Sequence, residues 1–190
     1  MIKIKSFFDI EKEEKWLNKQ LQKGFRCTNI SGLGIYTFEK IDKRYVMRLD
    51  YQDYLQKEKF EDYKGMYEDF GWSCIKGSQR GLQYWQKEAD AQNELYSDRQ
   101  SESNYYKRVM NYTSSLTVVS FLISYMIYKD SDLFLFLTEG LWDMEGALFW
   151  KALIFETPFI LLSSCPALMT IFFGRSFYKA YRKHSMLKEQ

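Results

Sequence analysis

The sequence predicts an N-terminal α+β domain followed by a hairpin of two transmembrane helices. Residues 1–104 are densely charged but neutral overall, with 18 basic and 18 acidic residues, whereas the charges of residues 105–190 are confined to narrow bands. In the first half, short runs of alternating polarity and runs of helical period follow one another. In the second half, two almost uncharged runs are each long enough to cross a bilayer. The two halves therefore suit different surroundings, water for the first and lipid for the second.

A pattern of glycine, cysteine and aromatic residues occurs twice in the first half, at a separation of 47 positions. The two copies read GFRCTNISGLGIYTFEK at 24–40 and GWSCIKGSQRGLQYWQK at 71–87. An alternating run and a run of helical period precede each copy, which gives the order strand, helix, strand, strand twice. One such unit has too small a core to be stable alone. We therefore predict that two repeats within residues 1–88 form one antiparallel sheet with two helices on one face.

This order of elements resembles the GyrI-like, or effector-binding, fold of bacterial drug-responsive regulators; a ferredoxin-like arrangement is the alternative. The resemblance implies a cleft between the helices and the sheet that holds small, often aromatic or cationic, ligands. Aromatic rings with a carboxylate as counter-charge would suit a cationic amphiphile. The candidate ligand-binding residues are Tyr36, Phe38, Glu39, Asp50, Tyr51, Tyr63 and Trp85. The competing interpretation is that these rings simply fill the core between helix and sheet.

A closer resemblance covers roughly residues 5–87. The stretches FFDIEKEEKWLNKQLQKGF, GIYTFEK, YVMRLDY and YEDFGW are similar to the uncharacterised bacterial membrane proteins grouped as the domain-of-unknown-function 2812 family. Members are typically a soluble domain followed by hydrophobic segments, and they are often encoded beside PadR-type transcriptional regulators. The resemblance implies a role in envelope sensing or regulation, and it supplies no catalytic residues.

Two runs of the second half are candidate membrane spans. Residues 109–128 carry no charge, and residues 152–174 carry only Glu156. A helix rises about 1.5 Å per residue, so each run can cross a hydrocarbon layer about 30 Å thick. We predict transmembrane helices at 108–128 and 152–174, joined by an acidic external or interfacial loop at 129–151. Basic residues flank the spans on the side of both termini, so we expect both termini in the cytoplasm and the chain in the cell membrane as a multi-pass protein.

The remaining segments connect or follow the spans. Residues 89–107 are expected to form a polar, partly helical linker, and residues 175–190 a basic cytoplasmic tail suited to anionic lipid. Residues 133–150 are expected in the outer interface, with a third span as the alternative. The lipid bilayer is thus an expected partner, and pairing of the spans is one route to a homo-oligomer. The side chains expected at the membrane interface are Lys107, Arg108, Trp142, Trp150, Arg175, Lys179, Arg182 and Lys183.

No constellation for catalysis or metal binding is legible in the sequence. The one histidine, His184, lies in the basic tail, which argues against His-based triads and multi-His metal sites. Cys27 and Cys74 are repeat equivalents outside any Cys-x-x-Cys motif, and Cys165 lies in a predicted span, so we expect reduced thiols. We therefore expect no enzyme, no cofactor and no metal, and the neutral first half argues against nucleic acid as a partner.

The resulting hypothesis is a membrane-anchored, non-enzymatic binding or regulatory module. Its cytoplasmic domain would bind a small molecule, or a regulatory or transporter protein, in envelope sensing. The alternative is a bacteriocin-type immunity or transport-accessory protein in which the helical hairpin is the working part. A small-molecule enzyme ranks third.

Overall fold

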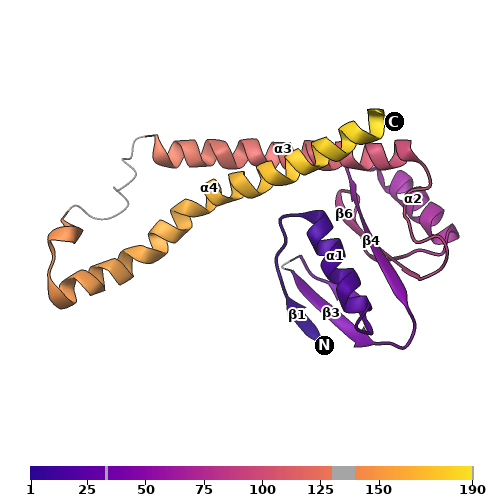
Figure 1. Ribbon diagram of the computed structural model, residues 1–190, viewed down its shortest axis with the longest axis horizontal. Helices are drawn as coiled ribbons and strands as arrows, with labels where there is room; N and C mark the ends of the chain where they lie inside the picture. The colour runs from indigo at the N-terminus through magenta and orange to yellow at the C-terminus, as the bar shows by residue number, and fades with distance from the viewer. Residues whose placement is uncertain (33, 130–139, 190) are drawn as a thin grey trace. The chain divides into compact units, whose positions relative to one another are not determined.

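The computed structural model describes residues 1–32, 34–129 and 140–189, and the chain divides into two compact units. The first unit consists of Met1–Met110 together with Lys179–Gln190, and the second of Asn111–Tyr178 (Figure 1). The first unit contains both sheets and two helices of its own, so the predicted α+β character of the N-terminal region is confirmed.

The strands of the first unit form two antiparallel sheets of three strands each, so the prediction of a single sheet was wrong. The strand orders are β1-β3-β2 in the first sheet and β4-β6-β5 in the second. In chain order, the elements are β1 (Ile2–Ile4), α1 (Ile10–Leu21), β2 (Phe25–Ile30), β3 (Ile35–Lys40), β4 (Tyr45–Gln52), α2 (Lys57–Asp69), β5 (Ser73–Lys76) and β6 (Gly81–Glu88). Helix α1 packs against β2 of the first sheet and β4 of the second, and so joins the two (Figure 1).

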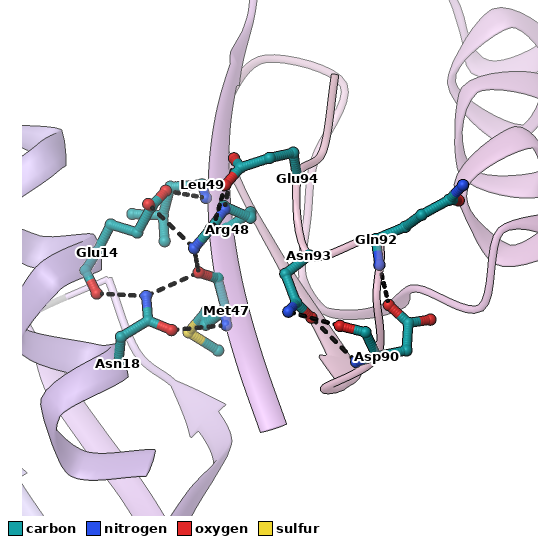
Figure 2. Close-up of polar contacts among 9 residues, drawn as sticks. All are labelled: Glu14, Asn18, Met47, Arg48, Leu49, Asp90, Gln92, Asn93 and Glu94. Atoms are coloured by element: carbon teal, nitrogen blue, oxygen red, sulfur yellow. Dashed lines mark hydrogen bonds and ion pairs between the residues drawn. The ribbon is translucent and has the colours of Figure 1, made fainter. Parts of the chain in front are cut away.

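The second sheet stops at β4 because side chains of α1 close the outer edge of that strand (Figure 2). Asn18 Nδ2 donates to Met47 O at 2.8 Å, and Met47 N donates to Asn18 Oδ1 at 3.0 Å, which is how a neighbouring strand would pair. Leu49 N donates to Glu14 Oε2 at 2.9 Å. These bonds satisfy backbone groups that an open sheet edge would leave unpaired. A helix therefore takes the place at β4 that a strand of the first sheet was expected to fill.

Replacing Asn18 tests whether this joint stabilises the first unit. We expect Asn18→Ala to lower the free energy of unfolding by about 1–3 kcal/mol, because the buried backbone groups of Met47 lose their partners. Asn93 is a matched control, since its amide pairs with the backbone N and O of Asp90 in the same way but in an exposed loop (Figure 2). Urea denaturation of both full-length variants in detergent provides the comparison, and equal losses would contradict the assigned role of Asn18.

The two sheets repeat one hydrogen-bonding register at the separation of 47 positions found in the sequence. Cys27 pairs with Phe38 in the first sheet, and Cys74 pairs with Trp85 in the second. In both sheets a register shift follows the cysteine directly. The helices before these strands are followed by Gly24 and Gly71, which have φ values of 78° and 80°. Such left-handed backbone favours glycine, which explains why both copies of the sequence pattern begin with this residue.

The segment expected as a linker belongs to the first unit. Leu95 is buried with Trp72 and Trp85, and helix α3 (Arg99–Tyr128) buries the side chains of Tyr105 and Tyr106 in its first turns. The last turns of helix α4 (Gly146–Glu189) join the same cluster through Ala180. This segment is therefore held to the sheets at Leu95, Tyr105 and Tyr106, and α3 begins inside the domain.

The second unit contains the remainder of α3, a short 3₁₀-helix (Leu141–Asp143) and most of α4. Tyr128 Oη donates to Ser163 O at 3.1 Å, and Thr117 Cγ2 lies 3.8 Å from the position that a Cβ on Gly174 would take. Hydroxyl groups of α3 bond back to carbonyls of their own helix, as Thr117 does to Thr113 O at 2.7 Å. The contacts of Tyr128 with Ser163 and of Thr117 with Gly174 place α3 and α4 antiparallel within this unit.

Among the residues that the structure describes, α4 alone is long and apolar enough to cross a membrane. In its most apolar stretch 6% of the residues are buried, unlike the core helix of a soluble protein. The prediction of a long apolar helix near the C-terminus is thus confirmed, whereas the predicted span at 108–128, which lies in α3, does not meet the same criterion. Trp142 and Trp150 are exposed, while residues 130–139 of the predicted loop lie outside the described residues.

Candidate functional site

A fully buried carboxylate, that of Asp50 on β4, is the first polar centre of the domain. Its two oxygens accept hydrogen bonds from β4 itself, from α2, from the segment before α3 and from α3. The donors are Gln52 Nε2 at 2.5 Å, Tyr63 Oη at 2.7 Å, Tyr96 Oη at 2.7 Å and Arg108 Nη2 at 3.0 Å. We call the Asp50 carboxylate and these four donors the Asp50 centre. It connects four separate parts of the chain.

Arg108 anchors α3 at the Asp50 centre. Its Nε also donates to Tyr51 O at 2.7 Å, so the guanidinium bonds both the side chain and the backbone of β4. Burial lowers the pKa of Arg108, but the Asp50 carboxylate outweighs burial and the pKa is raised. Burial and the same carboxylate raise the pKa of Tyr63 and of Tyr96, so both phenols stay protonated and act as donors. The residue expected at the membrane interface thus fixes the start of α3 to the sheet.

A second buried carboxylate, Glu13 on α1, joins the two sheets. Its Oε1 accepts hydrogen bonds from Tyr36 Oη on β3 and from Tyr84 Oη on β6, both at 2.7 Å. Burial raises the pKa of Glu13 and outweighs the two hydrogen bonds, which lower it. Burial also raises the pKa of the nearby Cys27 thiol to about 12. Glu13 is therefore a joint between the sheets, and Cys27 stays a protonated thiol.

The seven candidate ligand-binding residues do not come together in one cleft. Tyr36 and Phe38 lie in the core under α1, where the ring of Trp16 packs on them at centroid distances of 4.9 and 5.8 Å. Glu39 is exposed and lies 3.8 Å from a guanidinium nitrogen of Arg26. The other four lie together around the Asp50 carboxylate. Tyr63 donates to Asp50, Trp85 donates to Tyr63, and the backbone oxygen of Tyr51 accepts from Arg108. The competing interpretation, in which the rings fill the core, describes Tyr36 and Phe38 well.

A pocket of about 360 Å³ lies in the first unit beside the C-terminal end of α2; we call it the aromatic pocket. It is lined by Met66, Tyr67, Phe70, Trp72, Lys87, Gln92, Glu94, Leu95, Tyr96, Ser97, Asp98 and Ser101. Tyr67 and Trp72 are buried, whereas Phe70 is 64% exposed and Met66 48% exposed at the rim. The volume is within the range of small-molecule sites. Aromatic rings thus form both the inner wall of the pocket and part of its entrance.

The charged side chains Lys87 and Asp98 at the aromatic pocket have partners within the protein. Lys87 Nζ lies 2.6 Å from Asp90 Oδ2 and 5.9 Å from the centroid of the Trp72 ring, so this ammonium is neutralised. Asp98 accepts hydrogen bonds from Ser101 N at 2.8 Å and Ser101 Oγ at 2.7 Å in the first turn of α3. These bonds lower the pKa of Asp98 and keep it ionised. The lining is therefore aromatic with a negative group at the start of α3.

A second pocket of about 340 Å³, the tyrosine pocket, lies on the other side of the segment 94–96. It is lined by Glu11, Glu14, Lys15, Arg48, Leu49, Glu94, Leu95, Tyr96, Glu102, Tyr105, Tyr106 and Lys183. Figure 2 shows Arg48 between two carboxylates, with Nη2 at 3.0 Å from Glu94 Oε1 and Nη1 at 3.6 Å from Glu14 Oε1. Burial raises the pKa of Glu14. The segment 94–96 thus forms a wall that both pockets share.

Neither pocket could be predicted from the sequence, because the segments that form the walls have no clear periodic pattern of polar and apolar residues. Residues 89–107 read as a polar linker, so Leu95 and Tyr96 were not considered as lining residues. Phe70 lies just after α2 and is exposed. The available signal was Phe70 directly before the glycine that ends the helix, since an aromatic at that point borders the first residues beyond it.

The described cysteines and the histidine do not line either pocket. No group of three or more side chains able to hold a metal ion occurs in residues 1–32, 34–129 and 140–189. Burial raises the pKa of the Cys74 thiol as well. His184 is buried, and its Nδ1 lies 3.0 Å from Ser103 Oγ, far from the solvated position expected for a tail residue.

Of the residues expected at the membrane interface, Arg108 is held by Asp50, and the other seven divide into two groups. Lys107, Arg175 and Arg182 are exposed, as are the two tryptophans already described. Lys179 and Lys183 pair instead with acids at the start of α1. The basic tail continues α4 without a break, so its lysines reach the domain.

A family model described as "Protein of unknown function (DUF2812)" matches residues 9–118. The chain belongs to this family. The DUF2812 match extends from the residue before α1, through β2 to β6, into α3, so it includes the Asp50 centre and Arg108. It also includes every residue that lines the aromatic pocket. No curated protein and no solved structure matches this DUF2812 chain.

Proposed function

We propose that this DUF2812 protein is a membrane-anchored, non-enzymatic module that binds an aromatic small molecule and relays binding to its membrane helices in envelope sensing. The observation that carries the proposal is the position of the aromatic pocket. Asp98 and Ser101 both line the pocket; Ser101 belongs to the first turn of α3, and Asp98 directly precedes that turn and accepts hydrogen bonds from Ser101. A ligand held there contacts the start of the helix that leaves the domain.

The membrane part of the proposal has two spans, residues 152–174 in α4 and residues 111–128 in α3, since Arg108 is held in the domain by Asp50. Because, among the described residues, α4 alone is apolar enough to span by itself, α3 is proposed to enter the bilayer as its partner. Exposed apolar side chains along α4 support the span in that helix. The antiparallel contacts with α3, and the hydroxyls of α3 that bond to their own helix, support the span in α3, because paired helices tolerate such residues in lipid. The flanking basic residues favour cytoplasmic termini.

The shared register of the two sheets supports an origin of the domain by duplication.

The chemistry of the aromatic pocket favours a planar aromatic cation. The ring of Phe70, which is 64% exposed at the rim, is available for stacking, and Tyr67 and Trp72 form the aromatic wall behind it. Glu94 is paired with Arg48 and Lys87 with Asp90, so Asp98 remains as the negative group of the lining. A ligand with one positive charge would therefore be attracted to the pocket, and an anionic one repelled.

Exposed rim residues allow a test that leaves the core intact. We expect proflavine, a planar aromatic cation, to bind the full-length protein in nanodiscs, as measured by isothermal titration calorimetry. Phe70→Ala should weaken binding about tenfold, since loss of an aromatic contact costs on the order of 1 kcal/mol or more. Tyr54→Ala is the matched control, because Tyr54 is equally exposed, at 67%, and does not line the pocket. Equal affinity in the two variants, or no heat with the wild type, would count against this site.

A further inference from the structure

The last turns of α4, Lys179–Glu189, form a strap on the domain. One side of the strap is buried, through Ala180 and His184, and the other side exposes Tyr181 and Met186. Because α4 is continuous, the strap begins about one helical turn after the proposed span at 152–174. The strap is thus a helical segment with two different faces next to the proposed membrane surface.

Ion pairs with the N-terminal turn of α1 hold the buried face of the strap. Lys179 Nζ lies 2.8 Å from Glu11 Oε2 and 3.3 Å from Asp9 Oδ2. Lys183 Nζ lies 2.9 Å from Glu11 Oε1 and 2.9 Å from Tyr106 Oη. Burial raises the pKa of Glu11, but the two ammonium groups outweigh it and the pKa is lowered. Both ends of each pair are therefore charged at neutral pH.

These pairs are partly exposed, which sets their strength. The lysine side chains are 39% and 41% exposed, and those of Asp9 and Glu11 18% and 21%. Ion pairs at such positions are weak and are screened by salt. The attraction of a basic side chain to an anionic lipid surface is of similar size. The strap carries Lys179, Arg182, Lys183 and Lys188 against one acid, Glu189, so its charge complements such a surface.

We propose that the strap is a switch for which the acids of α1 and an anionic lipid surface compete. This proposal rests on the membrane anchoring proposed above. In a neutral membrane the strap stays on Asp9 and Glu11. In an anionic membrane its cations turn to the lipid headgroups. Lys183 lines the tyrosine pocket, so release of the strap removes one wall of that pocket and leaves the carboxylate of Glu11 open there.

Zero-length carbodiimide cross-linking of the native full-length protein reports these contacts directly, because it joins a carboxylate only to an amine in contact with it. Nanodiscs of phosphatidylcholine are compared with nanodiscs that contain phosphatidylglycerol, since neither lipid carries an amine or a carboxylate. The pair Lys43–Glu88, at 2.9 Å and exposed, is the internal control within the same unit. We expect the yield of the Glu11–Lys183 cross-link, relative to Lys43–Glu88, to fall at least threefold with phosphatidylglycerol.

Two further arms define the source of the effect. Arg182→Gln removes an exposed cation that takes no part in the lysine pairs, and it should weaken the lipid effect while leaving the cross-link in neutral nanodiscs unchanged. Inorganic phosphate at equal ionic strength should leave the relative yield unchanged, and a fall with phosphate alone would overturn the role of lipid. A relative yield that is the same in both nanodiscs, or no Glu11–Lys183 product in either, would also overturn the proposal. Failure of the chain to enter nanodiscs would instead contradict the membrane anchoring.

Discussion

Asp50→Ala is expected to lower the free energy of unfolding by about 3–5 kcal/mol, because it leaves the Arg108 guanidinium buried without its carboxylate. The tyrosine hydroxyls of Tyr63 and Tyr96 lose their acceptor in the same variant. Urea denaturation of the full-length protein in detergent, followed by tryptophan fluorescence, measures the loss. The variant should also unfold at the start of α3 first, because Arg108 is the polar anchor of that helix.

A double variant separates the charge from the packing. Asp50→Asn combined with Arg108→Met removes both charges and keeps similar volumes, so we expect it to recover part of the stability that Asp50→Ala loses. Arg108→Met alone should be costly, since it leaves the Asp50 carboxylate buried without a cation. A loss below about 1 kcal/mol in Asp50→Ala would mean that the Asp50 carboxylate is solvated and that its ion pair contributes little to stability, contrary to its complete burial.

Glu13→Ala is expected to lower the free energy of unfolding by about 2–4 kcal/mol, because the buried hydroxyls of Tyr36 and Tyr84 both lose their acceptor. Glu13→Gln is the matched variant, since its side-chain oxygen can still accept from both phenols. The same denaturation experiment should therefore rank the glutamine variant well above the alanine variant. Equal losses would show that packing of the side chain, and not the two hydrogen bonds, supplies the stability.

The contribution of Glu13 to the free energy of unfolding should depend on pH with a definite sign. Burial raises the pKa of Glu13 in the folded state above its unfolded value. The stabilising contribution of the carboxyl is then fully present below the unfolded pKa and is lost as the pH rises through the raised folded pKa. Glutamine does not titrate, so Glu13→Gln should gain stability relative to the wild type as the pH rises from acid to neutral. A constant difference between them across that range would contradict the raised pKa.

The order of elements follows from local patterns that a sequence displays. The glycines after α1 and α2 mark helix ends because only their backbone readily adopts positive φ, and the alternation in residues 45–51 marks β4. Sheet membership does not follow, because it depends on an edge that Asn18 closes from a distant helix. No local pattern distinguishes an asparagine that pairs with a strand edge from one in water.

Long-range pairing also explains why the candidate site was missed. Asp50 and Arg108 are 58 positions apart, and the sequence predicts them separately, Asp50 as a ligand counter-charge and Arg108 as a membrane-interface residue. Lys183 and Glu11 are separated by most of the chain. The aromatic pocket needs the segment 94–98 to fold back on α2, and that segment carries no periodic pattern to announce a packed position. Local periodicity thus predicts elements, while the site depends on how buried charges pair.

Alkaline carbonate extraction of cell membranes that contain the full-length chain tests the central claim most directly, since it removes peripheral proteins and leaves membrane-spanning ones. The account predicts that the chain stays in the membrane pellet, held by α4 and its partner helix. Recovery of the chain in the carbonate supernatant would contradict it.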